Sequence, residues 1–393
     1  MLIFLVFLIC FILINYEVGK RNIYIWFPVY IYQYFKRKPK INFNESVHIV
    51  FSFVDHFEPR WNEASYEDEV KRVDIWLRRY PELAKKHKDA NGVCPQHTFF
   101  YPAEEYRAEH LEKLARLCRE GFGEVEIQLH HNNDTSGGFR EKIEQCKEDF
   151  KGHNLLSINK ESKEIRFGFV HGNWALDNSR RDGKRCGVNN ELKILRETGC
   201  YADFTLPSAP SDTQTRKINS IYYAKDNPDK PKSHNTGIDV EIGKKPSGDL
   251  MIIQGPLALN WKRRKWRILP RIENGSITRE NPPIPQRVDL WIRRHIHVKG
   301  KPNWIFVKVY THGAQEKNFD TLLGKPMDEM LTYLETKYND GKNFRLHYVT
   351  AREMYNIIKA AEAGKVGEPG KYRNYLLEAN IKTESQELIG NRS

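Results

Sequence analysis

The sequence predicts an α/β fold, an incomplete (β/α) barrel of about seven parallel strands with an inserted basic subdomain. Along most of the chain, apolar extended runs alternate with amphipathic helical patterns, which is typical of βα units around a parallel sheet or barrel. Two apolar runs also end abruptly in imidazoles and carboxylates, at residues 55–58 and 130–134. A chain of 393 residues with 39% hydrophobic residues can bury a core of this size.

The first 45 residues have a composition of their own. Residues 1–14 contain no charged side chain. No cleavage site follows them and no basic residue precedes them, so we expect a retained membrane anchor over residues 1–16, although a full span takes roughly 20 residues. Residues 23–35 are rich in aromatics and lead into a basic cluster, which predicts an interfacial linker over residues 17–45. The alternative is that residues 23–35 are a first packing element of the globular domain.

Charge and cysteine usage limit the partners and the compartment. The chain has 63 Lys and Arg against 51 Asp and Glu, a formal charge of +12, which favours an anionic partner such as phospholipid or an acidic glycan. It contains no recognised base-reading motif, so we expect no nucleic-acid role. Apart from Cys10, the cysteines are odd in number and unpaired in spacing. Together with cations that follow the apolar run, this favours a membrane protein with a cytoplasmic domain, without settling the side.

The body of the chain, residues 46–365, is expected to form the barrel. Strands are predicted near residues 47–54, 98–101, 125–129, 165–170, 202–206, 304–311 and 344–349. Leu111, Leu114, Ala115 and Cys118 recur at helical spacing, which predicts a helix there, and residues 328–337 and 351–363 follow the same pattern.

Residues 213–300 interrupt the alternation and are predicted to be an insertion. They interleave cations with Trp261, Trp266 and Trp291, a composition that suits sugar stacking, phosphate contact or docking at a membrane interface. The alternative is a solvated basic face whose tryptophans lie in the core. Residues 366–393 are expected to be a polar tail.

Four stretches, in this order along the chain, resemble the metal-dependent polysaccharide deacetylases, carbohydrate esterases built on an incomplete (β/α) barrel. They are Phe53-Val-Asp-His56, His97-Thr-Phe-Phe-Tyr101, Arg119-Glu-Gly-Phe-Gly-Glu-Val-Glu-Ile-Gln-Leu-His130 continuing to Asp134, and Val307-Lys-Val-Tyr-Thr-His312. The resemblance spans roughly residues 47 to 350. It implies a bound divalent metal ion, for which Zn²⁺ is the preferred candidate and Co, Mn or Ni would also fit.

The resemblance also implies roles for individual residues. His56, His130 and Asp134 fall at the metal positions, Asp55 at the general base, and His312 at the general acid. The family has Asp where this chain has His56, and a second His where this chain has Asp134. The exchanges keep two imidazoles and one carboxylate, an inventory that suits Zn²⁺. Glu58 and His131 are substitutes should His56 or His130 point away.

A second group of residues is expected to bind substrate. Residues 167–174 occupy the place of the family's arginine-proline motif but have neither residue, so His171 or Asn173 would have to orient the base. Trp174 could stack on a sugar ring, or pack within the barrel. Asp203 follows a further strand and is expected to face the same mouth.

These features predict a metal-dependent hydrolase that removes an acyl group, N-acetyl first, from an acetylated polysaccharide or a lipid-linked sugar. One alternative is a metal-independent glycoside hydrolase on a related barrel, which needs two carboxylates flanking the scissile bond. The other is a non-catalytic protein that binds glycans or assists envelope assembly.

Overall fold

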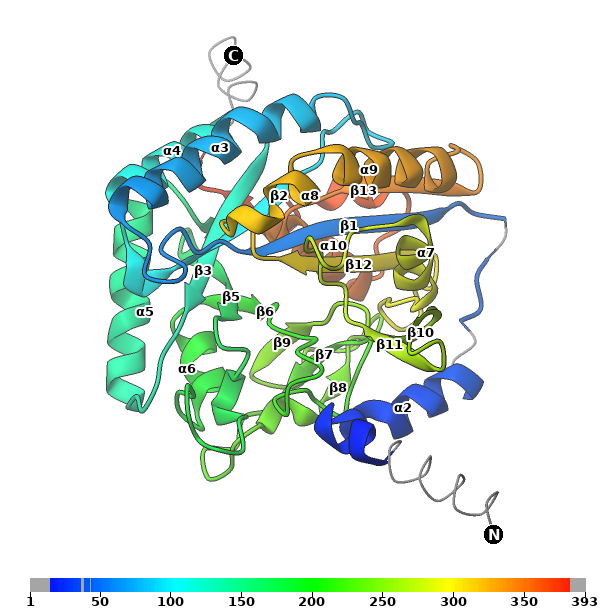
Figure 1. Cartoon of the computed structure of the whole chain (residues 1–393), viewed down its shortest axis with the longest axis horizontal. Coiled ribbons are helices and arrows are strands. Elements are labelled where there is room, and N and C mark those ends of the chain that lie inside the picture. Colours follow the sequence, from blue (N-terminus) through cyan, green and yellow to red (C-terminus); the bar gives the residue numbers. More distant parts are fainter. Residues whose placement is uncertain (1–14, 37–38, 43, 382–393) are drawn as a thin grey trace.

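The computed structural model describes residues 15–36, 39–42 and 44–381 (Figure 1). All but residues 15 and 16 of the predicted anchor lie outside these ranges. Within the described ranges, no helix has the length and apolar character that crossing a bilayer requires.

A curved, mostly parallel sheet forms the centre of the molecule. Its main path runs in the order β12-β1-β2-β3-β5-β6-β9-β7-β8. The seven predicted strands are all present: β1 (Val47–His56), β2 (His97–Pro102), β3 (Gly123–Leu129), β5 (Ile165–His171), β6 (Cys200–Asp203), β12 (Trp304–Thr311) and β13 (Phe344–Tyr348). Every pairing among them is parallel, so their carboxyl ends lie toward one edge. This arrangement is α/β and barrel-like, as predicted.

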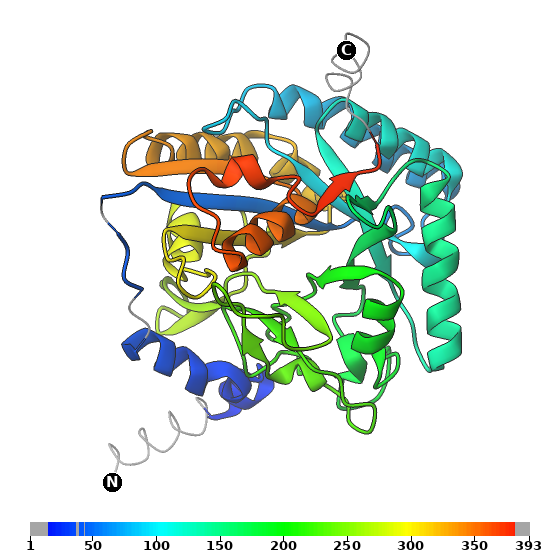
Figure 2. The same ribbon diagram turned by 180° about the vertical axis from the view of Figure 1, so that it is seen from behind.

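Helices cover the outer face of the sheet (Figures 1 and 2). They are α3 (Tyr66–Ala84), α4 (Ala108–Arg119), α5 (Ser136–Lys151), α6 (Glu191–Glu197), α8 (Phe319–Leu322) and α9 (Lys325–Tyr338), while α10 (Ala351–Glu362) packs with the inner face. Side chains of β1 alternate between the two layers. Phe51 and Phe53 belong to the outer cluster, and Val50 and Val54 to the inner one. This alternation determines whether each residue at the end of β1 points to the outer or to the inner layer.

The region between β6 and β12 is partly sheet and partly a separate layer. Strands β7 (Ile221–Ala224), β8 (Ile238–Asp239) and β9 (Leu250–Ile253) extend the main sheet. A hairpin of β10 (Ala258–Lys265) and β11 (Leu269–Glu273) forms a second sheet, and α7 (Pro285–Arg293) follows it. The region expected to be an insertion therefore contributes strands to the central sheet as well as a projecting hairpin.

Both ends of the described chain are packed against the body. Helix α2 (Ile23–Lys36) buries Trp26 and Tyr30 against Leu257 and Ala258. At the other end, where a polar tail was expected, β14 (Leu377–Ala379) pairs antiparallel with β4 (Ser157–Asn159).

Glu126 on β3 is a buried carboxyl whose titration is expected to govern stability. It accepts hydrogen bonds from the Tyr201 hydroxyl at 2.6 Å and from the Gly168 backbone N–H at 2.5 Å. Burial nevertheless raises its pKa to about 8. The folded state thus holds this proton more tightly than the unfolded state, so stability falls as pH rises from about 4.5 through about 8.

Replacing Glu126 with glutamine removes this titration while keeping the shape. We expect Glu126→Gln to gain stability relative to the natural chain as pH rises through that window, by roughly 4 kcal/mol at most. Urea unfolding of both proteins at pH 5, 7 and 9 measures the difference. A constant difference across the three pH values would contradict the raised pKa.

Candidate functional site

Polar side chains converge where the parallel strands end. His56 ends β1 and Glu58 follows it, Glu104 and Glu105 lie in the turn after β2, His130 follows β3, and His312 follows β12. The carboxyl ends of parallel strands are where barrel enzymes place their active sites. We refer to this set as the mouth cluster.

His56, Glu58 and His312 form the centre of the mouth cluster. One ligand atom from each lies within 4.8 Å of the other two. The rings of His56 and His312 stack with centroids 5.0 Å apart. His56 Nδ1 is buried and makes no hydrogen bond with any residue that the structure describes, and Glu58 Oε1 lies 3.9 Å from it. Burial, reinforced by the nearby His312 and His130, lowers the pKa of His56 well below its usual value, so the ring is neutral, as a metal ligand must be.

His130 lies on the rim of this group between two carboxylates. Its Nδ1 is 2.5 Å from Glu104 Oε1, and its Nε2 is 3.3 Å from Glu58 Oε1. Burial opposes the charged form, but the hydrogen bonds to Glu104 and Glu58 outweigh it and raise the pKa of His130 to about 10. The Gln128 amide also donates to Glu58, at 2.5 Å. Glu58 is therefore held in place from β3 by two side chains.

Glu105 is a second carboxyl group of the mouth cluster, and its pKa is shifted in the opposite direction to that of Glu58. Burial, and then the neighbouring charge of Glu104, raise its pKa to about 7. Its Oε2 is buried without a hydrogen-bond partner among the residues of the described ranges. In contrast, burial of Glu58 would raise its pKa, but the hydrogen bond to His130 prevails and the pKa is lowered. Glu58 is thus ionised at neutral pH, whereas the Glu105 carboxyl is close to half protonated.

Asp55 does not lie in the mouth. By the alternation of β1 it points to the outer layer, whose core includes its neighbours Phe53 and Phe57. Its Oδ1 accepts from the Gly313 backbone N–H at 2.6 Å, and its Oδ2 is 2.8 Å from His97 Nε2. A Cβ at residue 313 would lie 2.0 Å from Asp55 Oδ2, so only glycine allows this contact. Asp55 thus anchors the turn that carries His312.

Asp134 is also separate from His56. Its Oδ2 lies 3.1 Å from His131 Nδ1 and 2.8 Å from Lys142 Nζ. His131, His171 and Glu191 form a second group whose ligand atoms lie within 4.8 Å of one another. The backbone N–H groups of Asn173 and Ala175 donate to His171 Nδ1, so the neutral ring carries its proton on Nε2. A protonated nitrogen cannot bind a metal, so this second group fits one less well than the mouth cluster.

The remaining predicted substrate residues divide between half-buried and fully buried positions. The Trp174 ring lies 5.9 Å from the rings of both His56 and His312, and so forms an aromatic wall of the mouth. Asn173 precedes it on the same loop. Asp203 is fully buried, where Thr205 donates to both of its oxygens. Its partner across the inner face is Lys308, whose ammonium donates to the backbone oxygens of Phe204 and Leu206.

Two other features lie away from this mouth. A third His/Glu group, His48, His347 and Glu368, involves the first residues of β1, and there His48 Nδ1 and His347 Nε2 already share a hydrogen bond at 3.0 Å.

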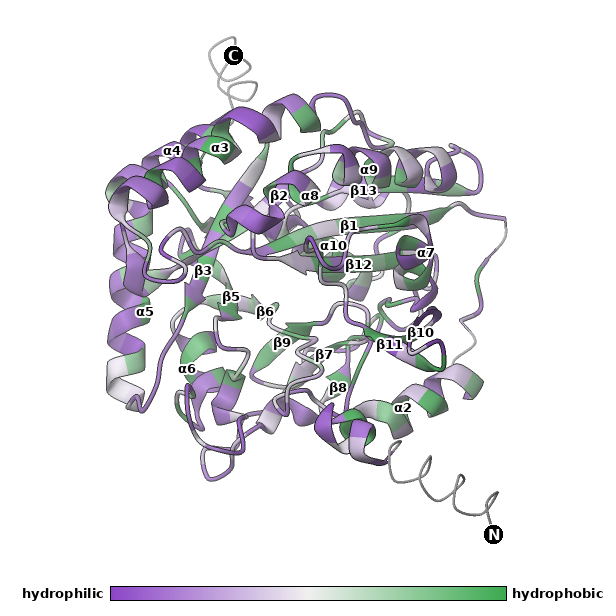
Figure 3. Ribbon diagram, viewed as in Figure 1, coloured by the Kyte–Doolittle hydropathy of each residue, from purple (hydrophilic) through white to green (hydrophobic). Residues whose placement is uncertain are grey.

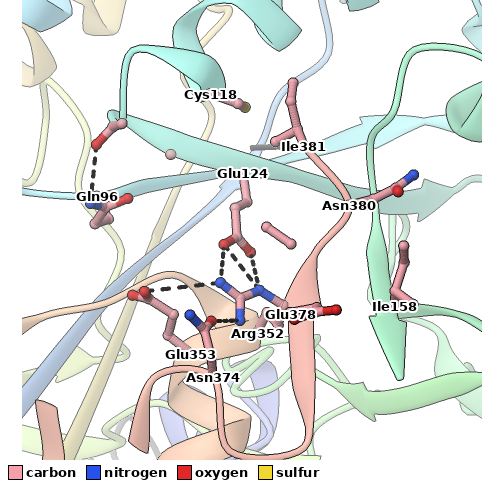
Figure 4. Close-up of a pocket in the computed structure, with 13 residues that line it drawn as sticks. Gln96, Cys118, Glu124, Ile158, Arg352, Glu353, Asn374, Glu378, Asn380 and Ile381 are labelled. Carbon is pink, nitrogen blue, oxygen red and sulfur yellow. Dashed lines mark hydrogen bonds and ion pairs between the residues drawn. The ribbon is translucent and has the colours of Figure 1, made fainter. Parts of the chain in front are cut away.

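A pocket of about 450 Å³ opens beside Gly123 at the start of β3 (Figure 4). Its lining includes the buried Glu124–Arg352 ion pair. In barrel folds, the amino-terminal end of the sheet serves stability rather than chemistry.

Sequence reasoning missed Glu104, Glu105 and Gln128, and ranked Glu58 only as a substitute. A signal for the first two was present, because Pro102-Ala-Glu-Glu105 follows β2 just as the polar clusters follow β1 and β3. For Gln128, the signal was its place as the last of three polar residues, after Glu124 and Glu126, that alternate with apolar ones along β3.

The fold and this cluster together define an α/β, barrel-like protein with several histidine and glutamate groups that could hold a metal. The chain matches no protein-family model and no curated protein. Among solved structures it is similar to a "putative glycoside hydrolase/deacetylase" from Parabacteroides distasonis, with 12% identity and a TM-score of 0.43 over 79% of this chain and 70% of that one. The mouth cluster is therefore the feature of this chain that bears on its activity.

Proposed function

We propose that the chain is a metal-dependent hydrolase that removes an acyl group from a glycan, and that this acyl group is an N-acetyl group. The observation that carries this proposal is the convergence of His56, Glu58 and His312 within 4.8 Å, where the buried Nδ1 of the neutral His56 ring has no hydrogen-bond partner in the described part of the chain. Two imidazoles and a carboxylate are the ligand set of many catalytic zinc sites. These residues would hold the ion, which would polarise the acyl carbonyl and provide hydroxide near neutral pH.

The protein's own groups supply the rest of the chemistry. Hydrogen bonds from His130 and Gln128 fix Glu58 for its role as a ligand. Glu105, with a pKa of about 7, can hold the proton that a departing sugar amine requires. Asp55, assigned from sequence as the base, acts in this proposal as a positioning residue for His312. Trp174 offers a face on which a sugar ring can stack.

One experiment tests metal dependence and activity together. Purified full-length protein is expected to contain about one transition-metal ion per chain. It should release acetate from N-acetylated oligosaccharides, lose this activity with a chelator, and regain it with Zn²⁺. His56→Ala is expected to lower the metal content as well as acetate release. Metal-free protein with undiminished acetate release would refute the proposal.

A glycoside hydrolase is the second candidate, favoured by the contrast between Glu58 and Glu105. One carboxylate with a lowered pKa and one carboxyl with a raised pKa in the same mouth is the pattern of glycosidase acid and base pairs. The same assay separates the two functions. New reducing ends that persist in chelator would favour the glycosidase, whereas chelator-sensitive acetate release favours the deacylase.

A further inference from the structure

Helix α2 presents an apolar outer surface, which is unusual for a helix on the outside of a protein. Trp26 and Tyr30 are buried, yet the exposed residues between positions 24 and 35 are also aromatic or aliphatic. Figure 3 shows hydrophobic residues recurring along this helix. From Asn22 to Phe35 there is no charged residue. The exposed fractions are 66% for Tyr32, 65% for Tyr34 and 64% for Phe35. A helix packed on a globular body normally turns polar residues to water.

The β10–β11 hairpin beside α2 adds exposed tryptophans and cations. Trp261 is 56% exposed, Trp266 63% and Ile268 71%. Lys262, Arg264 and Arg267 are exposed between them. Lys265 Nζ lies 3.2 Å from Glu17 Oε1, which joins the hairpin to the residues just before α2 (Figure 1). We call α2 and residues 261–268 together the aromatic-basic surface.

This surface adjoins the loops that leave the carboxyl ends of the strands. The Asn22 amide donates to the Pro210 carbonyl, at 3.0 Å, in the loop after β6. The Arg181 guanidinium lies 5.6 Å from the centre of the Tyr24 ring, and Arg181 belongs to the loop after β5 that also carries Trp174. The loop after β5 therefore connects the aromatic-basic surface with Trp174, the aromatic wall of the mouth.

We propose that the aromatic-basic surface binds an anionic phospholipid bilayer. Tyrosine and tryptophan prefer the headgroup region, and cations beside them are attracted to anionic lipid. The chain's formal charge of +12 has the complementary sign, and the uncharged residues 1–14 precede α2 in the sequence, separated from it by residues 15–22. If the proposed deacylase function holds, on which this step rests, the enzyme acts on a glycan carried at the membrane, such as a lipid-linked sugar.

Vesicle binding by the full-length protein tests the docking surface without any substrate. We expect tighter binding to vesicles of phosphatidylglycerol and phosphatidylcholine than to phosphatidylcholine alone. Lys262→Glu/Arg264→Glu/Arg267→Glu is expected to weaken binding to the anionic vesicles about 100-fold, since each basic residue near the surface contributes about fivefold. The control Lys71→Glu/Lys163→Glu/Lys325→Glu changes the charge equally at exposed sites on other elements and should bind nearly as well as the natural chain.

Tryptophan quenching by brominated lipid separates this surface from residues 1–14. Anionic vesicles with brominated acyl chains should quench the natural protein's emission, and Trp261→Phe/Trp266→Phe should lose most of that quenching. Equal quenching in this variant, or equal anionic preference after the charge reversal, would overturn the proposal. So would a lipid-independent dimer that Trp261→Ser/Trp266→Ser dissociates, because the surface would then bind a second copy. Vesicle binding without acetate release would refute only the proposed activity.

Discussion

Replacing Glu58 with glutamine is expected to lower kcat/KM for acetate release by about 10³-fold, with loss of bound metal. Glutamine keeps the shape and the hydrogen bonds of Glu58 but removes the negative oxygen ligand. A bound ion provides several kcal/mol of stabilisation to the developing charge, and each 1.4 kcal/mol is a factor of ten in rate. Because Glu58 lies between His56 and His130, the loss should affect the whole mouth cluster.

Asp134→Asn is the matched control. Asp134 is the carboxylate assigned to the metal by sequence resemblance, whereas in the structure it contacts His131 and Lys142. We expect Asp134→Asn to retain metal and to lose less than about tenfold in kcat/KM, because its ion pairs are with His131 and Lys142 rather than with the mouth cluster. Metal content and initial rates of the two variants, measured side by side, decide between the two ligand sets. The reverse ranking would return the metal to Asp134.

The strands could be predicted because their signal is local. An apolar run bounded by turn residues identifies β1, β3 or β12 without knowledge of its neighbours. The short strands β7 to β9 were not predicted, because prolines, glycines and lysines separate them and only their pairing partners stabilise them. Helix α2 was left between two interpretations because an all-round apolar pattern does not reveal which face is covered.

The site was harder to predict because it depends on which face of its strand each residue occupies and on the path of each loop. Strand β1 is buried on both faces, including its polar residues His48 and Ser52, so a buried strand pattern alone does not show whether Asp55 or His56 points inward. A shift of one residue exchanges the two. Likewise, the loop after β3 decides whether His130 or Asp134 reaches the mouth cluster. The spacing of four residues does not specify that path.

Arg352→Met is expected to reduce the free energy of unfolding by about 3–5 kcal/mol, since removal of one partner strands the other charge in the interior. The Arg352 guanidinium lies 2.5 Å from Glu124 Oε1 and also donates to the Asn374 side chain at 2.6 Å and to the Leu377 carbonyl at 2.9 Å (Figure 4). Arg352 thus links α10, β3 and the segment that precedes β14. Burial raises the pKa of Glu124 and the Arg352 charge lowers it, so the variant should take up a proton there.

The double variant Glu124→Gln/Arg352→Met separates the stranded charge from the lost packing. It should recover part of the stability, because no unpaired charge remains buried, while the unmet Leu377 carbonyl keeps it below the natural chain. Urea unfolding at pH 7, followed by circular dichroism, gives the three free energies. Acetate release by the folded variants should stay near the natural rate, because the pair lies at the amino-terminal end of the sheet, opposite the mouth. A single variant as stable as the natural chain would show that Glu124 is neutral or solvated there.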